Sequence, residues 1–211
     1  MAEEMSMNRL IHGAVRRDLR RFAHALDAFP QGDRQRAEQL RTAWDFFYGE
    51  LDYHHHSEHA IVWPALRTVG VDGALLAQMD AEHERLAAAL EAAGEKLRAL
   101  QQTPTTATTD EARTAIATLH SVAEEHLAHE ERDVEPLYLA KRNTPELKAM
   151  SRKFARDRSP LRAGDFFAWL QNGASAEERA ALRRELPPPV LAVFSRVLGR
   201  RYRSRVAPVW A

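Results

Sequence analysis

Two matching triplets of histidine, histidine and glutamate constrain the fold of this chain more than any other feature. In each triplet the second histidine precedes the glutamate by four residues, and the first histidine lies 42 or 43 residues further upstream. A histidine and a glutamate four residues apart lie on one face of an α-helix, one turn from each other. The triplets therefore predict two helices with one such pair each and two helices with a single histidine. The six residues are His12, His54 and Glu58 in the first triplet and His83, His126 and Glu130 in the second.

Apolar residues recur at alternating spacings of three and four along the first two-thirds of the chain, as in amphipathic helices. Breaks near residues 30–32, 70–73 and 103–109 divide this region into four long segments, and no alternating strand pattern competes. The six histidines and glutamates occupy gaps in the apolar stripes at similar distances from the turns, so we expect them to converge in one layer of the core. The pattern predicts an all-α, up-down-up-down four-helix bundle over residues 5–140.

The pattern changes beyond about residue 141, where shorter helical segments follow. Ser175 and Glu178 form a capping-box pattern, and three consecutive prolines at 187–189 precede a final predicted helix over 190–203. The aromatic residues of this region, Phe166, Phe167 and Trp169, need a surface to cover. We expect residues 141–211 to form a C-terminal helical extension packed on the bundle.

Composition excludes several classes of function. The chain has 211 residues, a formal net charge of zero and no cysteine, which excludes disulfides, thiolate metal sites and a cysteine nucleophile. We expect a cytoplasmic protein, since no apolar stretch is long enough for a membrane span and no signal peptide is recognisable. A nucleic-acid partner is not expected, although five arginines and no acidic residue follow Glu185. The oligomeric state is left open.

Buried glutamates are costly unless they are paired or bind a cation. Imidazole and carboxylate ligands together suit iron, manganese or zinc, and the carboxylates favour iron or manganese. One alternative is a shifted register in which His55 and His59, also four residues apart, are the ligands. Glu131 is an acidic neighbour that either supports the site or replaces Glu130.

These motifs resemble those of the hemerythrin-like family of histidine–histidine–glutamate cation-binding proteins, over about residues 5–140. The resemblance rests on the element H-H-x-x-E-x-x-x-x-x-P, from His54 to Pro64, and on H-x-x-x-E in the fourth helix. It implies a bundle that holds two iron atoms, with the six residues as ligands and the two glutamates as bridging carboxylates. Manganese and zinc are the alternative metals.

The chain also departs from the oxygen-carrying members of that family. They place two histidines four residues apart on the third helix, where this chain has Ala87 after His83, and an aspartate where it has Glu131. One ligand is thus absent or replaced by His55, Glu131 or water. An open coordination position favours activation of a small oxidant over reversible oxygen carriage.

Three functions follow as expectations. The first is a non-haem di-iron protein that binds or reacts with O₂, peroxide or NO. The alternative is a di-iron oxygenase or oxidase that acts on a small organic substrate in specialised metabolism. The third is a structural zinc or manganese bundle, or an interaction module that uses the basic tail.

Overall fold

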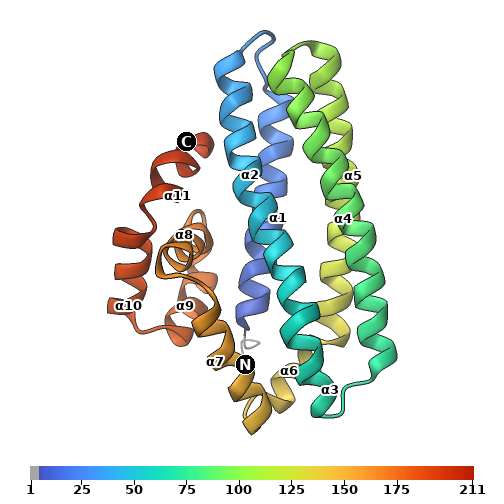
Figure 1. Cartoon of the computed structure of the whole chain (residues 1–211). Helices are drawn as coiled ribbons and strands as arrows, with labels where there is room; N and C mark the ends of the chain where they lie inside the picture. The colour runs from blue at the N-terminus through green and yellow to red at the C-terminus, as the bar shows by residue number, and fades with distance from the viewer. Residues whose placement is uncertain (1–4) are drawn as a thin grey trace.

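The computed structural model describes residues 5–211, except the side chains of residues 155 and 156, and all of its regular elements are helices. Four long helices form a bundle in which consecutive helices run in opposite directions (Figure 1). Each contacts its two neighbours, so that α1 and α2, α2 and α4, α4 and α5, and α5 and α1 close a ring. The four are α1 Met7–Asp27, α2 Arg34–Ser57, α4 Gly73–Gln102 and α5 Thr106–Asp133. The all-α fold predicted from the sequence is confirmed.

Local sequence explains where these helices begin. The side chain of Ser6 accepts a hydrogen bond from the backbone of Arg9 at the start of α1, and Asp33 does the same for Arg36 at the start of α2. Such caps satisfy amide groups that have no partner inside the helix. Gly32 and Gly70 adopt positive φ angles of 81° in the connections that lead into α2 and α4, a conformation that glycine adopts without strain.

The core of the bundle is made by the apolar stripes that the sequence shows. Trp44 and Phe47 of α2 both pack edge-to-face against Phe22 of α1 and lie tilted against each other, and all three are at most 1% exposed. Full burial of such side chains contributes about 1.5–3 kcal/mol each. The packed stripes hold the four helices at fixed positions, and the polar layer is built on this frame.

One end of the bundle is closed by short helices. The π-helix η1, Glu58–Val62, continues α2 directly and leads into α3, Trp63–Thr68, while α6, Glu135–Lys141, follows α5. In η1 the backbone N–H of Trp63 donates to the carbonyl of Glu58, five residues back. A π-turn of this kind adds one residue to a helical turn, often at a functional site.

The rest of the chain is helical, as predicted. The capping box of Ser175 and Glu178 is confirmed. The single final helix predicted over 190–203 is wrong, because the chain breaks at Gly199, which approaches Gly164 so closely that a Cβ atom on either would clash. The elements are α7 Pro145–Asp157, α8 Pro160–Gln171, α9 Ala176–Glu185, α10 Pro188–Ala192, π-helix η2 Val193–Leu198, α11 Arg200–Arg205 and 3₁₀-helix η3 Ala207–Trp210.

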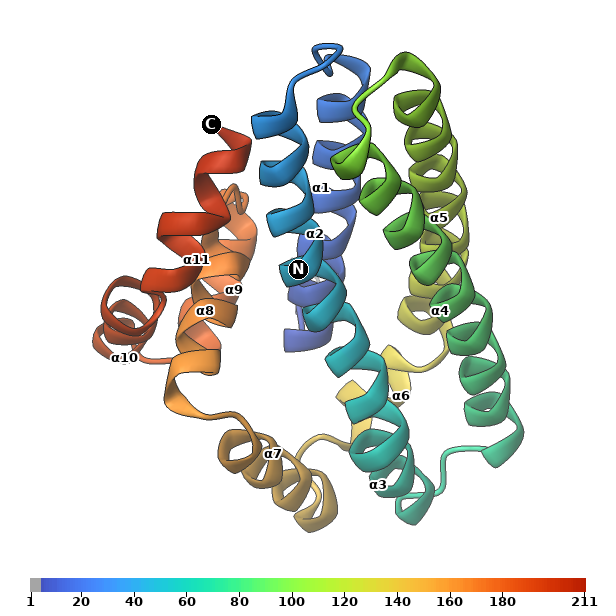
Figure 2. The ribbon, with the colours of Figure 1, turned by 45° about the horizontal axis from the view of Figure 1, so that its top comes forward.

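This C-terminal segment lies along the α1 and α2 side of the bundle in both views (Figures 1 and 2). The indole N–H of Trp169 donates to the buried carboxylate of Asp18 over 2.7 Å, and Arg36 donates to the carbonyl of Val209 over 2.9 Å. The division into two parts at residues 140 and 141 stays a prediction. Within residues 5–211, every helix is too short or too polar to cross a membrane.

Candidate metal centre

The structure brings all six predicted residues together in the core. His12 comes from α1, His54 from the last turn of α2, Glu58 from the first position of η1 and His83 from α4, while α5 supplies both members of the second pair. Each is at most 9% exposed. They fall into two groups of four that share Glu58, and in each group the nitrogen and oxygen atoms lie within 4.8 Å of one another. One group borders a cavity between the bundle and the C-terminal helices and is called the cavity-side group. It consists of His12, His54, Glu58 and Glu130. The other, called the inner group, consists of His55, Glu58, His83 and His126.

In the cavity-side group the donor atoms face one another. His12 Nε2 lies 3.3 Å from His54 Nε2 and 3.1 Å from Glu130 Oε2. Glu58 Oε1 lies 3.3 Å from His54 Nε2. Ligand atoms that bind one ion at about 2.0–2.2 Å lie roughly 2.8–3.6 Å from one another, so these separations fit a common cation.

The inner group uses the other oxygen of the same carboxylate. Glu58 Oε2 lies 3.3 Å from His83 Nε2, which lies 3.1 Å from His126 Nε2. The ring of His55 stacks on that of His83 with centroids 4.3 Å apart. Glu58 therefore stands between two sets of imidazoles, one oxygen towards each.

Unsatisfied atoms support a cation at this place. His55 Nε2, Glu58 Oε2 and Glu130 Oε2 are buried and make no well-aligned hydrogen bond among the described residues, although Glu130 Oε2 lies 3.1 Å from His12 Nε2. A buried polar atom without a partner is costly, and all three belong to the two groups. A bound cation would satisfy them, so the residues present fit a pair of metal ions.

His55 is a candidate ligand outside the two triplets, which the sequence offered only as one possible replacement for an absent ligand. It lies one position past His54, off the apolar stripe, yet it is 8% exposed and its ring faces the inner group. The alternative in which both His55 and His59 are ligands does not agree with the structure. His59 is exposed, and its ring nitrogen lies 3.0 Å from Asp80 and not in either group. Ala87, the position of the absent second histidine, is exposed. Two features of the sequence pointed to His55: it belongs to the run of three histidines at residues 54–56, and α4 lacks the second histidine that could have filled its place.

Glu131 supports the site and is in neither group. Its Oε1 lies 2.9 Å from His12 Nδ1 and accepts from Arg16 over 2.6 Å. Glu82 contacts the inner group in the same way. One of its oxygens lies 3.1 Å from His126 Nδ1, and the other lies 2.7 Å from His129 Nδ1. Carboxylates that bind the outer nitrogen of a histidine fix its ring and leave the other nitrogen free for a metal.

The histidines of the inner group are neutral at pH 7. Burial lowers the pKa of His83 to about 4, and it lowers the pKa of His126 and, by a larger amount, that of His55. Neighbouring imidazoles act in the same direction on His83 and His55. Neutral imidazole is the form that binds a metal. Metal binding to the inner group therefore displaces no proton that gives its histidines a positive charge.

The cavity-side group is mixed. Burial lowers the pKa of His54. Burial also opposes the charge of His12, but the carboxylates of Glu130 and Glu131 outweigh it and raise the pKa of His12 to about 9. Burial and the nearby Glu130 raise the pKa of Glu58. At pH 7 a cation therefore has to displace a proton from His12.

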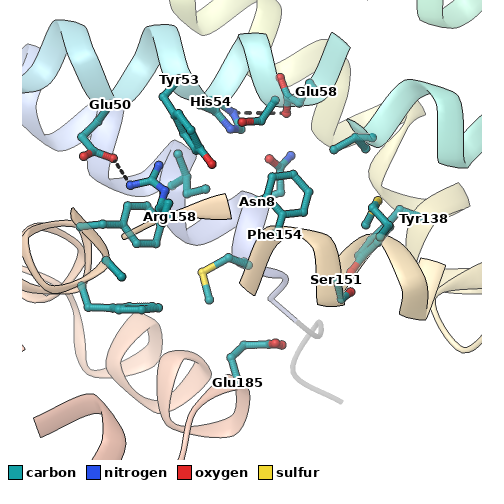
Figure 3. A pocket seen from close by; sticks show the side chains of 18 of the residues that line it. Asn8, Glu50, Tyr53, His54, Glu58, Tyr138, Ser151, Phe154, Arg158 and Glu185 are labelled. Carbon is teal, nitrogen blue, oxygen red and sulfur yellow. Dashed lines mark hydrogen bonds and ion pairs between the residues drawn. The ribbon is translucent and has the colours of Figure 1, made fainter. Parts of the chain in front are cut away.

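A cavity of about 510 Å³ adjoins one side of the centre. His54, Glu58 and Glu130 line it, whereas Glu58 is its sole contact with the inner group. Figure 3 shows His54 and Glu58 on one wall and Phe154 and Ser151 of α7 opposite them. Bundle and C-terminal helices thus enclose the space together.

The helical bundle with two histidine–glutamate groups in its core is the arrangement of a cation-binding helical bundle protein. The family model of the hemerythrin HHE cation binding domain matches residues 8–138, more than half of the chain, and the chain belongs to this family. The matched segment contains both groups and ends within α6. No curated protein matches the chain significantly, and neither does any solved structure.

Proposed function

We propose that the chain is a non-haem di-iron protein that binds or reacts with O₂, peroxide or NO. The observation that carries this proposal is the division of seven buried residues into two groups of four around one shared carboxylate, Glu58. Two groups favour two metal ions, and the nitrogen and oxygen donors suit iron, with manganese or zinc as alternatives. His55 joins the six predicted residues as the seventh proposed ligand.

The roles of the two glutamates differ in this proposal. Glu58 presents one oxygen to each group, which supports a bridging role. Glu130 has one oxygen beside His12 and accepts a hydrogen bond from Asn8 over 3.1 Å at the other. Its bridging role stays a prediction from the family resemblance.

The protein's own residues hold the centre and limit what reaches it. When bound, the iron pair supplies electrons to dioxygen or peroxide. Glu82 and Glu131 orient His126 and His12, so that each ring presents Nε2 to its group. Trp63 covers the inner group, since its ring lies parallel to that of His83 at 6.0 Å and donates to Asp80. Small molecules therefore have their access on the side of His54, Glu58 and Glu130.

The cavity favours the second candidate, a di-iron oxygenase or oxidase with a small organic substrate. Binding of O₂ or NO alone needs no enclosed space of about 510 Å³, which lies in the range of about 300–1,000 Å³ found for pockets that hold organic ligands. Both candidates use the same centre. They differ in whether an organic molecule is oxidised while oxygen is consumed.

Metal content and the optical spectrum test the proposal. The chain is reconstituted anaerobically with ferrous iron and then exposed to O₂. We expect about two irons per chain, one for each group, and new near-ultraviolet and visible bands on oxidation. Absence of iron uptake, with zinc alone retained, contradicts both candidates and leaves a structural bundle. Oxygen consumption without oxidation of any added amine or thiol favours the first candidate over the second.

A further inference from the structure

The outer face of the last helices exposes apolar side chains. Val190 of α10 and Val193 and Val197 of η2 are 39%, 51% and 59% exposed, and Leu161 of α8 is 65% exposed. These are four of the six large apolar or aromatic side chains that are exposed in residues 5–211. Gly164 of α8 lies against the end of η2, and Leu161 is one turn before it, so the leucine stands near the same face. A helix on the surface normally directs polar residues outward, and this face does not.

The polar side chains of the same helices are almost all arginines. Arg196 and Arg200 lie three and seven positions after Val193 and share its side of the helix. Arg203 donates to the backbone carbonyl of Arg196 over 2.9 Å, and none of the arginines pairs with a carboxylate within residues 5–211. The chain has no acidic residue after Glu185 that could offset their charge. All five arginines are exposed, namely Arg196, Arg200, Arg201, Arg203 and Arg205.

The inner side of these helices is fixed to the rest of the protein. Leu191, Ser195 and Tyr202 are buried, and α8 packs against η2 and α11. Asp165 of α8 accepts a hydrogen bond from the backbone N–H of Tyr202 over 2.9 Å. Figures 1 and 2 show α10 and α11 on the side of the molecule opposite α4 and α5. The valines and arginines are thus held in a rigid layer that faces outward.

Charge and apolar surface together decide what covers this face. In a two-fold dimer the arginines would meet their own copies, and like charges that face each other are unfavourable. Nucleic acid would pair the arginines through its phosphates but would leave the valines without an apolar partner. An anionic lipid surface satisfies both kinds of side chain. Basic and apolar residues on one helix are typical of helices that lie in such a surface.

We propose that this outer face docks on the surface of a membrane that contains anionic lipid, without crossing it. The arginines pair with phosphate and carboxylate groups of the lipid, and their apolar stems let the valines and Leu161 enter the boundary of the acyl chains. The inference goes beyond the proposed function and requires no metal, because none of these residues belongs to either ligand group. Failure of docking therefore leaves the di-iron proposal as it stands.

Vesicle sedimentation of the full-length chain tests the proposal. Vesicles of phosphatidylcholine alone are compared with vesicles made of equal parts of phosphatidylcholine and phosphatidylserine. We expect at least about 100-fold tighter binding to the mixed vesicles, because each arginine near an anionic surface contributes about fivefold. High salt should weaken the binding, since it screens exposed charges. Equal binding to both kinds of vesicle, or binding to neither, overturns the proposal.

Charge variants place the contact on this face. The double variant Arg200→Gln and Arg201→Gln removes two charges from exposed positions and should weaken binding to the mixed vesicles about 25-fold. The matched control, Arg67→Gln and Arg98→Gln, removes two charges from exposed positions on α3 and α4 and should leave the binding unchanged. If both double variants lose the same affinity, the attraction is a property of the whole molecule and the assignment to this face is wrong.

Variants of the valines separate lipid from a purely electrostatic partner. The double variant Val193→Asn and Val197→Asn keeps every charge and should still weaken vesicle binding at least about 10-fold, because it removes apolar side chains from the acyl boundary. Both positions are exposed, so the fold should survive, and circular dichroism checks this. Unchanged vesicle binding in this variant contradicts insertion. Binding of the unaltered chain to duplex DNA that equals or exceeds its binding to the mixed vesicles assigns the face to nucleic acid and overturns the proposal.

Discussion

The two groups of candidate ligands are of equal size but differ in donors, charge and access. The inner group has three neutral imidazoles and one carboxylate, while the cavity-side group has two carboxylates and a protonated His12. Three residues of the cavity-side group line the cavity. The difference teaches that two candidate metal positions are not equivalent, although one pair of similar sequence triplets supplies most of their residues. We expect the inner position to hold its metal and the cavity-side position to meet the oxidant and the organic molecule.

Removal of the carboxylate that both groups share should have the largest effect. Glu58→Ala takes one ligand from each position and leaves a gap between them, so we expect the metal content to fall from about two ions per chain to well below one. Native mass spectrometry of the iron-loaded protein measures this. Glu84→Ala, an exposed glutamate on α4, is the control. Retention of a full ion by Glu58→Ala contradicts the shared role.

Single replacements in each group should remove one ion and keep the other. His55→Ala deletes a ligand of the inner group, and His12→Ala deletes one of the cavity-side group. Each variant is expected to bind about one iron per chain, and the two spectra should differ because the remaining donors differ. If His55→Ala still binds two ions, His55 is no ligand and the inner group has three members.

The supporting carboxylates should produce a smaller effect, again on one position each. Glu82→Gln acts on His126, and Glu131→Gln acts on His12. Replacement of such a partner typically weakens metal binding about 10–100-fold. Competition titrations with a chelator give the two affinities. Equal losses at both positions in either variant would mean that the groups are not independent.

The smallest effect, and the sharpest contrast between the groups, is in the pH dependence. His12, with a pKa of about 9, stays protonated below that pH, so each unit of acidification should weaken the cavity-side position about tenfold. Burial and the nearby Glu130 raise the pKa of Glu58, which is shared by both groups. In the inner group His83, with a pKa of about 4, is already neutral.

The two single variants separate these pH dependences. His55→Ala reports the cavity-side position alone, and its zinc affinity, measured between pH 6 and pH 8 by competition titration, should rise steeply with pH. His12→Ala reports the inner position and should show a shallower rise, because His83 is already neutral in this range. Identical slopes would contradict the assignment of the protons.

Much of the centre follows from the sequence because helices repeat every 3.6 residues. The spacing of four between His126 and Glu130 places both on one face of α5, and the stripes around them place that face in the core. Convergence of residues from four helices then follows from short connections and similar helix lengths. The prediction of the all-α fold uses the same periodicity and needs no knowledge of individual contacts.

The remainder depends on packing that periodicity does not encode. His55 lies about 100° around the helix from His54, and only the angle of α2 against α4 turns its ring onto His83. The cavity arises where α7 and α8 stand off from the bundle, which no local pattern specifies. The break of the final helix at Gly199 depends on the close approach of Gly164, a contact 35 residues away in sequence.

The π-turn at Glu58–Val62 divides one continuous helical axis into two parts with different rotational phase. An α-helix advances by about 100° per residue, so the extra residue in this turn rotates everything beyond it by about that angle relative to α2. The part before the turn directs His54 and His55 into the core. The part after it directs Trp63 onto His83. Deletion of one residue between 59 and 62 would keep every amino acid of both parts and still turn the indole away from the imidazole, so the insertion itself carries the alignment.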